Sequence, residues 1–187
     1  MSTPRYTVPG MSTRDGGAVI ELLNLRLHAL NDLALTLKHV HWNVVGPHFI
    51  AVHEMLDPQV EAVRAMVDET AERISTLGGS PHGTPGALVA ERTWDDYGIG
   101  RAGAIAHLGA LDVVYTGLIE EHRAVARATE ETDPVTQDML IGQLHSLELF
   151  QWFVRAHLET AGGDLSTAGA GTERGAAERA AGGDSSA

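Results

Sequence analysis

The sequence predicts an all-α protein, a four-helix bundle in which one long crossover connection carries a short helix. Three observations lead to this prediction. The chain has 187 residues, which is near the size of one domain. Its apolar residues recur at steps of three and four, the period of a helix with one buried face. Four such stretches, of roughly 25 to 30 residues each, follow one another with short, long and short connections.

The first two predicted helices form a pair joined by a short turn. The first runs from Ala18 to about Val45 and is stopped by Gly46–Pro47. The second covers residues 49–77 and is closed by Gly78–Gly79, a typical C-terminal cap signal. Pro58 lies inside it and should bend this helix locally, because proline removes one backbone hydrogen bond.

A long connection separates this pair from the second pair of helices. Residues 80–103 are rich in Gly, Pro and Asp, and we expect them to form the crossover with its short helix. A third helix is predicted from about Ala104 to Ala128. Asp133 then has the properties of an N-cap with Pro134 at the first helical position, so a fourth helix begins there and ends by Gly162.

Both ends of the chain differ in composition from the helical part. Residues 1–17 contain several Pro and Gly and predict a flexible arm. Residues 162–187 are rich in Ala and Gly and predict a disordered tail, because so little apolar bulk cannot offset the entropy of ordering. The predicted four-helix domain therefore covers residues 18–161.

The composition excludes several classes of function. Acidic residues outnumber basic ones by 25 to 13, a net charge of −12 that disfavours nucleic-acid binding by the body of the protein. The absence of cysteine removes disulfides and thiolate sites, and leaves imidazole and carboxylate as ligands suited to iron, manganese or zinc. No stretch resembles a membrane span or a secretory signal, so we expect a cytoplasmic protein without membrane contact.

One face of the second predicted helix has a row of metal-ligand types. The residues recur at steps of three or four, beside the apolar stripe: His53, Asp57, Glu61, Arg64, Asp68 and Glu72. Such a row is usually a solvated face. However, the apolar stepping of the first helix continues from Leu37 onto His41. An antiparallel hairpin around Gly46–Pro47 would bring the imidazoles of His41 and His53 together.

Distance along the helix restricts how these ligands can cooperate. His53 and Asp68 are 15 residues apart, about 22 Å on a helix axis, whereas metal ligands lie about 2 Å from the ion. One chain therefore cannot bring His53 and Asp68 to one ion. If the two histidines serve the same site as Asp68 and Glu72, a second subunit must supply half of it, and a two-fold dimer would build two such sites.

At this point the residues resemble the Dps family, the DNA-binding proteins from starved cells, also called mini-ferritins. The resemblance covers roughly residues 17–159. It rests on His41-Trp42-Asn43-Val44-Val45-Gly46-Pro47-His48-Phe49, Val52-His53-Glu54, Asp68-x-x-Ala71-Glu72-Arg73-Ile74 and Leu77-Gly78-Gly79. It implies a ferritin-like four-helix subunit in a hollow homododecamer with ferroxidase sites at its two-fold interfaces. The implied activity is oxidation of Fe(II), preferably by hydrogen peroxide, with storage of the ferric mineral and protection against oxidative damage.

The same resemblance implies roles for individual residues. His41 and His53 would come from one subunit and Asp68 and Glu72 from its mate, to bind iron as the catalytic ligands. Asp57 matches a position that often assists them. Trp42 matches an aromatic residue beside the iron that could absorb stray oxidising equivalents. Asp138 and Glu148 match two acidic positions that line iron-entry pores.

Two other classes of function stay open at this stage. One is a nucleoid protein that mainly binds and compacts DNA, and the other is a metal-free helical interaction module. Family members that condense DNA usually do so through lysine-rich arms. Here the tail from residue 160 has a net charge of −2, residues 1–16 have +1, and the remaining −11 lies on the helical body. DNA binding is therefore doubtful.

Overall fold

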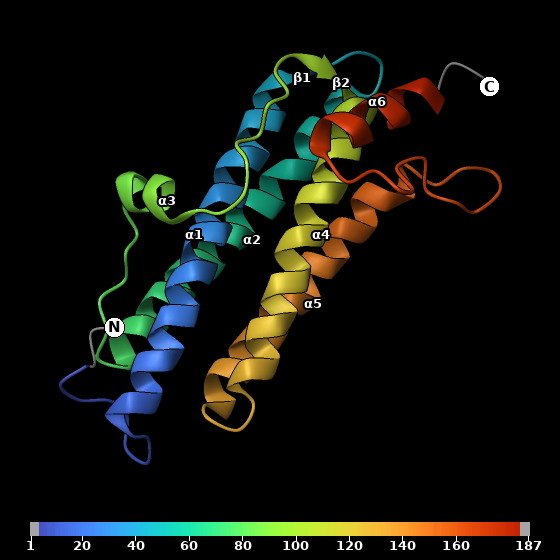
Figure 1. Cartoon of the computed structure of the whole chain (residues 1–187). Coiled ribbons are helices and arrows are strands. Elements are labelled where there is room, and N and C mark those ends of the chain that lie inside the picture. Colours follow the sequence, from blue (N-terminus) through green and yellow to red (C-terminus); the bar gives the residue numbers. More distant parts are fainter. Residues whose placement is uncertain (1–3, 184–187) are drawn as a thin grey trace. The chain divides into compact units, whose positions relative to one another are not determined.

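The computed structural model describes residues 4–183, and the regular secondary structure in this part of the chain is almost entirely helical (Figure 1). The predicted all-α class is confirmed, with four long helices and a short helix in the crossover. The elements in chain order are α1 Thr13–Asn43, β1 Val44–Val45, α2 Phe49–Thr76, α3 Pro85–Glu91, β2 Ala102–Gly103, α4 Ala104–Thr129, α5 Pro134–Ala156 and α6 Glu173–Gly183.

The chain folds into two compact units, and each is built from parts of the same four long helices. The first unit consists of Met1–Leu35, Glu61–Trp94 and Glu121–Leu144. The second unit consists of Thr36–Val60, Asp95–Glu120 and His145–Ala187. The apolar stripes predicted from the sequence form the interior of each unit.

In the first unit, polar contacts join the packed helices beside a leucine-rich core. The buried guanidinium of Arg26 on α1 pairs with Glu121 on α4. Arg73 on α2 donates to the carboxylate of Asp133, 2.7 Å away, at the start of α5. The core of this unit includes four leucines of α1 with at most 1% of their surface exposed: Leu23, Leu27, Leu30 and Leu33.

In the second unit, a buried tyrosine links two helices. The hydroxyl of Tyr115 on α4 donates to Gln59 Oε1 on α2 over 2.7 Å, and both side chains are buried. Burial raises the pKa of Tyr115 far above its usual value, so this hydroxyl stays protonated and remains a donor. The surrounding core is formed by fully buried leucines of α1, α2 and α4: Leu37, Leu56, Leu108 and Leu111.

The N-terminal arm is more ordered than predicted. Helix α1 begins at Thr13, five residues before the predicted start, because Ser12 caps it: its Oγ accepts from the backbone N of Asp15 over 3.1 Å. Farther upstream, Pro4 is buried and Tyr6 passes Gly78, where a Cβ would lie 2.1 Å from the Tyr6 carbonyl oxygen. The predicted flexible arm is thus partly packed, and its residues 1–3 lie outside the described part.

The C-terminal segment differs most from the prediction. Residues 162–187 were expected to be disordered, but helix α6 forms within them and packs on α4 (Figure 1). Close approach makes this possible, because a Cβ on Gly109 would lie 2.7 Å from the carbonyl oxygen of Ala176 and 2.9 Å from Ala180 Cβ. The alanine side chains at this contact are small enough to bury without much loss of rotamer entropy. Residues 184–187 lie outside the described range.

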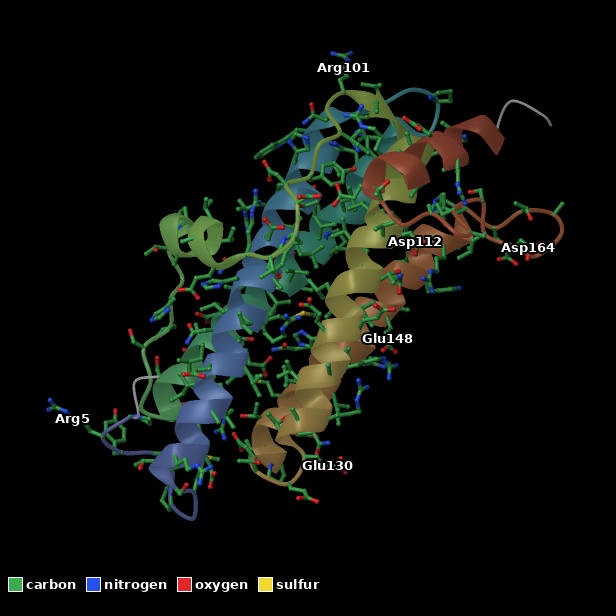
Figure 2. The ribbon with its side chains drawn as sticks, in the orientation of Figure 1. Arg5, Arg101, Asp112, Glu130, Glu148 and Asp164 are labelled. Atoms are coloured by element: carbon green, nitrogen blue, oxygen red, sulfur yellow. The ribbon has the colours of Figure 1, made fainter. Side chains whose placement is uncertain are left out.

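A buried aspartate ties the preceding loop to the helices. Asp112 on α4, labelled in Figure 2, accepts from Arg155 Nε at 2.6 Å and from Gln151 Nε2 at 3.0 Å, both on α5. Thr167 Oγ1 donates to its other oxygen at 3.0 Å. Helix α5 itself ends at Ala156, before the predicted limit at Gly162, in tighter i→i+3 backbone bonds.

The contact between α4 and α6 allows a direct test with two glycines of the same helix. Gly109→Ala is expected to release α6, because its new methyl group meets Ala176, whereas Gly117 faces open space. Overpacking costs about 1 to 3 kcal/mol, so the released population should rise by a factor of about 5 to 150. Trypsin cleavage after Arg174 and Arg179 should accelerate by this factor, since it tracks the open population.

Gly117→Ala is the matched control, because both substitutions raise helix propensity by a similar amount. Its cleavage rate should equal that of the unmodified chain. Equal rates for Gly109→Ala and Gly117→Ala would contradict the close packing of α6 on α4.

Candidate metal centre

A tight turn between α1 and α2 positions the candidate ligands. Gly46 has φ +95°, a backbone conformation that favours glycine, and its carbonyl oxygen accepts from Phe49 N over 3.1 Å. The two residues before it form β1, which pairs in parallel with β2, with Val44 opposite Ala102. This turn reverses the chain direction within the second unit, so that the last turn of α1 lies beside the first turn of α2.

The hairpin brings His41 and His53 into direct contact. The two imidazole rings stack with their centroids 3.6 Å apart and their planes 21° apart. His41 Nδ1 lies 2.9 Å from the carbonyl oxygen of His53, and His53 Nδ1 lies 2.9 Å from the carbonyl oxygen of His41. The phenyl ring of Phe49 adds a contact to His53, at 4.9 Å between centroids.

These reciprocal hydrogen bonds determine the protonation of both rings. A carbonyl oxygen can only accept, so each Nδ1 carries the proton and donates. In the neutral imidazole the lone pair is then on Nε2. Among the described residues, neither Nε2 has a hydrogen-bond partner. Backbone carbonyls that hold the distal ring nitrogen are the usual second contact of metal-binding histidines, because they orient the ring and raise its basicity.

Asp57 lies beside this pair and is held by a lysine. Lys38 Nζ donates to Asp57 Oδ1 over 2.7 Å, and His41 Nδ1 lies 3.4 Å from the same oxygen. The hydrogen bond from Lys38 lowers the pKa of Asp57, with smaller contributions from the charges of both histidines and the lysine, against a desolvation effect that raises it. Asp57 is therefore ionised at neutral pH.

The sequence analysis did not assign Lys38 to this site, although a signal was present. Lys38 is the only lysine in the chain. Positions 38 and 57 are nearly equidistant from Pro47, as are His41 and His53, so the hairpin that pairs the histidines also pairs Lys38 with Asp57. The symmetric spacing about the turn could have identified this contact.

Asp68 and Glu72 lie farther along α2, in the first unit, and both are exposed. Helix α2 is continuous from Phe49 to Thr76, so four helical turns separate Asp68 from His53. Within residues 4–183, no three His, Asp or Glu side chains are close enough together to hold a metal ion. A single chain thus presents two imidazoles in one unit and two carboxylates in the other.

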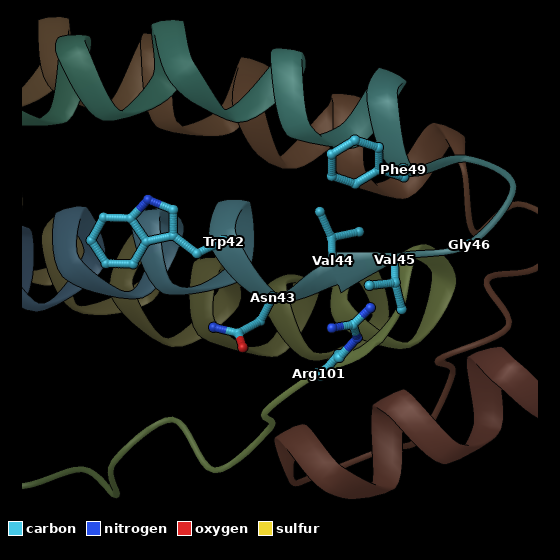
Figure 3. Close-up of a pocket in the computed structure, with 7 residues that line it drawn as sticks. All are labelled: Trp42, Asn43, Val44, Val45, Gly46, Phe49 and Arg101. Carbon is cyan, nitrogen blue, oxygen red and sulfur yellow. The ribbon is translucent and has the colours of Figure 1, made fainter.

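Trp42 lines a cavity next to the histidine pair (Figure 3). The indole is 70% exposed, and the cavity, of about 510 Å³, is bounded by this residue, the turn after α1 and the side chain of Arg101. Phe49 forms another wall and is 38% exposed. The sequence analysis did not identify Arg101, which precedes β2 and is brought to the cavity by the pairing of β1 with β2.

The two acidic residues assigned to pores lie on α5 in different environments. Asp138 is exposed in the first unit, whereas Glu148, labelled in Figure 2, is partly buried in the second. Ten residues separate them on one helix, a distance of about 15 Å. The two residues therefore lie in different units, and a role for either in a pore stays a prediction. Within the described residues, no helix is both long and apolar enough to span a membrane.

Comparison with known proteins assigns the chain to a family. The family model described as "Ferritin-like domain" matches residues 20–162. The "DNA protection during starvation protein" of Mycolicibacterium smegmatis is 58% identical over 175 residues, which cover 94% of this chain and 96% of that protein. The solved structure "DpsA14 from Streptomyces coelicolor" has 70% identity and a TM-score of 0.86, and covers 87% of this chain and 97% of its own. For "Mycobacterium smegmatis Dps" the identity is 57%, the TM-score 0.87, and the coverage 90% and 95%. The chain belongs to the Dps family of ferritin-like proteins, the mini-ferritins.

Proposed function

We propose that the protein is a ferroxidase and iron-storage mini-ferritin, which oxidises Fe(II), preferably with hydrogen peroxide, and stores the ferric mineral in a hollow homododecamer. The observation that supports this most directly is the reciprocal bonding of His41 and His53. It commits both Nδ1 atoms to backbone carbonyls and leaves the Nε2 lone pairs of two stacked imidazoles available to a metal ion. Protection against peroxide suits the reducing cytosol, where we place its action.

The proposed site is shared between two subunits. One chain would supply His41 and His53, and Asp68 and Glu72 would come from its two-fold mate, because four helical turns of α2 separate the two pairs within a chain. A two-fold axis that relates antiparallel α2 helices would form two identical sites at once. Asp57, ionised and 3.4 Å from His41 Nδ1, would keep that proton in place and add negative charge beside the iron.

The chemistry of these donors suits iron as a substrate that must enter and leave. Neutral imidazole and carboxylate are ligands that Fe(II) accepts, and the negative carboxylates stabilise the additional positive charge of Fe(III). Each Fe(II) gives one electron. Two of them reduce one hydrogen peroxide, whose O–O bond breaks and which takes up two protons to form two waters. Because both electrons are delivered together, no hydroxyl radical is released.

Three further residues have proposed supporting roles. The exposed indole of Trp42 would take up stray oxidising equivalents near the site, since it lines the cavity next to the histidine pair. Asp138 and Glu148 would line iron-entry pores, where carboxylates concentrate cations. The charge of −11 on residues 17–159 would favour iron entry in the same way.

Particle mass and reaction stoichiometry test this proposal together. Twelve chains of 19.9 kDa give about 240 kDa, which light scattering after size exclusion would measure. Anaerobic titration with hydrogen peroxide should consume two Fe(II) per peroxide, and a spin trap should detect no hydroxyl radical. A monomer, or one Fe(II) oxidised per peroxide with trapped radical, would contradict the proposal. A metal-free interaction module would show no oxidation above the rate in buffer.

DNA compaction is the second candidate, and the name of the M. smegmatis relative favours it. The structure of the tail argues against it here, because α6 packs on α4 and Arg179 donates to the carbonyl oxygen of Ala168. We expect no retardation of duplex DNA in a mobility assay at physiological salt, and only weak retardation at low salt. Firm retardation at physiological salt would show that DNA binding is a main function.

A further inference from the structure

We propose that Tyr97 is a redox-active tyrosine that takes over stray one-electron oxidising equivalents, with His107 as the acceptor of its phenol proton. Both residues belong to the second unit, Tyr97 in the crossover segment and His107 on α4. Neither of them is among the proposed iron ligands. Two parts of this role rest on the proposed function, namely the source of the oxidant and the Fe(II) that restores Tyr97.

A hydrogen bond joins the two side chains directly. Tyr97 Oη lies 2.9 Å from His107 Nδ1, and the two ring planes are 13° apart. His107 is fully buried, and burial lowers its pKa below the usual value, although hydrogen bonds to the backbone of Asn43 and Gly100 act against this. The imidazole is therefore neutral at pH 7. A phenol is a stronger acid than a neutral imidazole, so the Tyr97 hydroxyl donates and the lone pair of Nδ1 accepts.

The hydroxyl of Tyr97 keeps its proton until the ring is oxidised. Burial, and to a smaller extent the charge of Glu173, raise the pKa of Tyr97 above its usual value. Removal of one electron reverses this, because the radical cation of a phenol is a strong acid and a buried cation is costly. The proton then passes over a single hydrogen bond to His107 Nδ1. The products are a neutral phenoxyl radical and an imidazolium ion.

Electrons and charge balance in the oxidation of Tyr97 and in its return. With hydroxyl radical as the oxidant, Tyr97 gives one electron that converts this radical to hydroxide, and the phenol proton stays on His107. With the radical cation of a tryptophan as the oxidant, the same electron restores the indole. In the return step, one Fe(II) gives an electron to the phenoxyl radical and becomes Fe(III), while His107 gives the proton back to the phenol oxygen.

The other two tyrosines of the chain have different surroundings. Tyr115 is fully buried, but its hydroxyl donates to Gln59 Oε1 over 2.7 Å, and an amide oxygen is too weak a base to take the proton. Tyr6 is 66% exposed in the first unit, so its phenol faces water. Of the three tyrosines, Tyr97 is therefore the one that combines a partly buried ring with a basic partner.

Tyr97 also lies near an exposed indole that stray oxidants can reach. Its ring contacts the ring of His39 on α1 edge to face, at 5.7 Å between centroids. His39 Nε2 lies 2.8 Å from the carbonyl oxygen of Ile99, a contact that holds this part of the crossover against α1. Trp42, which is 70% exposed, follows His39 by three residues, so their side chains are neighbours on the helix surface. An oxidised Trp42 thus has Tyr97 as a nearby source of an electron.

Pulse radiolysis of the full-length chain in iron-free azide solution tests this role, because azide radicals oxidise exposed indoles. The background variant is Tyr6→Phe, which removes the exposed tyrosine. We expect the absorption of the indolyl radical to decay as that of a neutral phenoxyl radical grows, at a rate independent of protein concentration. Tyr97→Phe removes one hydroxyl group and should abolish the phenoxyl signal. His107→Gln replaces the base by an amide, as beside Tyr115, and should slow the transfer by more than about tenfold.

The matched control is Tyr115→Phe, which removes the other buried hydroxyl and should leave the yield and rate of phenoxyl formation equal to those of the background. Equal signals in Tyr97→Phe and Tyr115→Phe, or an unchanged rate in a His107→Gln chain of normal helical circular dichroism, would overturn the inference. These measurements contain no iron, so failure of the proposed ferroxidase activity would leave them unchanged. Fe(II) added in a second series should shorten the lifetime of the phenoxyl radical, and an unchanged lifetime would refute its return by the iron substrate.

Discussion

Particles made only of His41→Ala chains, or only of Asp68→Ala chains, are expected to lose peroxide-driven oxidation of Fe(II). Particles assembled from an equal mixture of the two should recover about a quarter of the activity of the unmodified protein. The measurement is the initial rate of Fe(II) oxidation after addition of hydrogen peroxide, compared at equal protein concentration with the rate in buffer.

The recovery follows from a site that two chains share. At an interface between one chain of each kind, one site lacks both its histidine and its aspartate. The other site keeps the histidines of the Asp68→Ala chain and the carboxylates of the His41→Ala chain, and is complete. Random assembly makes half of the interfaces mixed, and one of the two sites in each is intact, so about one site in four is active.

The two substitutions differ in their structural cost, which determines the controls. Asp68 is exposed, so its replacement should leave the fold intact. His41 is 6% exposed, so His41→Ala needs an unchanged helical circular-dichroism spectrum and particle mass. His145→Ala and Glu130→Ala, at exposed positions, should oxidise Fe(II) at the normal rate. Full activity in either single-variant particle, or no recovery in the mixture, would contradict a shared site.

Asp133→Ala is expected to destabilise the folded chain by about 3 to 5 kcal/mol, the largest stability effect of any substitution proposed here. Asp133 is 3% exposed and accepts two hydrogen bonds from Arg73 Nη2, at 2.8 and 2.7 Å. It also caps α5, because its Oδ1 accepts from Thr136 N over 3.3 Å. Its removal leaves the Arg73 guanidinium, only 13% exposed, without its partner charge.

The effect should depend on pH with a defined sign. Burial alone would raise the pKa of Asp133, but the hydrogen bonds from Arg73 and Thr136 outweigh it and lower the pKa below its usual value. The unfolded chain thus binds this proton more readily than the folded one. The stabilisation by Asp133 is complete above the pKa of about 3.9 that its carboxyl group has in the unfolded chain. It is lost as the pH falls through the lower pKa of the same group in the folded chain.

Urea unfolding at fixed protein concentration would measure both results, since assembly makes stability depend on concentration. The difference between the unmodified chain and Asp133→Ala should be constant from about pH 5 to 8 and should shrink below about pH 4. Glu131→Ala, an exposed neighbour, should change stability by less than about 0.5 kcal/mol. A difference that stays constant into acid would show that Asp133 acts only through packing.

Local signals were sufficient for the four long helices. The apolar steps of three and four require only neighbours along the chain, so they predicted the helix type and most of the boundaries. Asp133 and Pro134 act within one turn of α5, and the predicted start of this helix is confirmed. The meeting of His41 and His53 was also a local inference, because both are close to the same turn at Gly46.

The packed ends of the chain could not be predicted in this way. Helix α6 depends on Gly109, more than 60 residues earlier, whose missing side chain allows the close approach of Ala176. Composition indicated too little apolar bulk for order, but it cannot show that a complementary surface exists elsewhere. The packed part of the N-terminal arm likewise depends on a distant glycine, Gly78, which the Tyr6 carbonyl approaches.

By itself, the sequence determined the helical class, the order of the helices and the residue types of the candidate metal ligands, because period, capping and residue type are properties of short segments. It also showed that His53 and Asp68 cannot bind one ion within one chain, since the rise of a helix is constant, so a site that uses both would need two copies of the chain. Only the tertiary structure decided which ring nitrogens of His41 and His53 are free, because their protons follow from carbonyl oxygens across the hairpin. It alone joined Arg73 to Asp133 across 60 residues, since contacts at that separation depend on how helices pack.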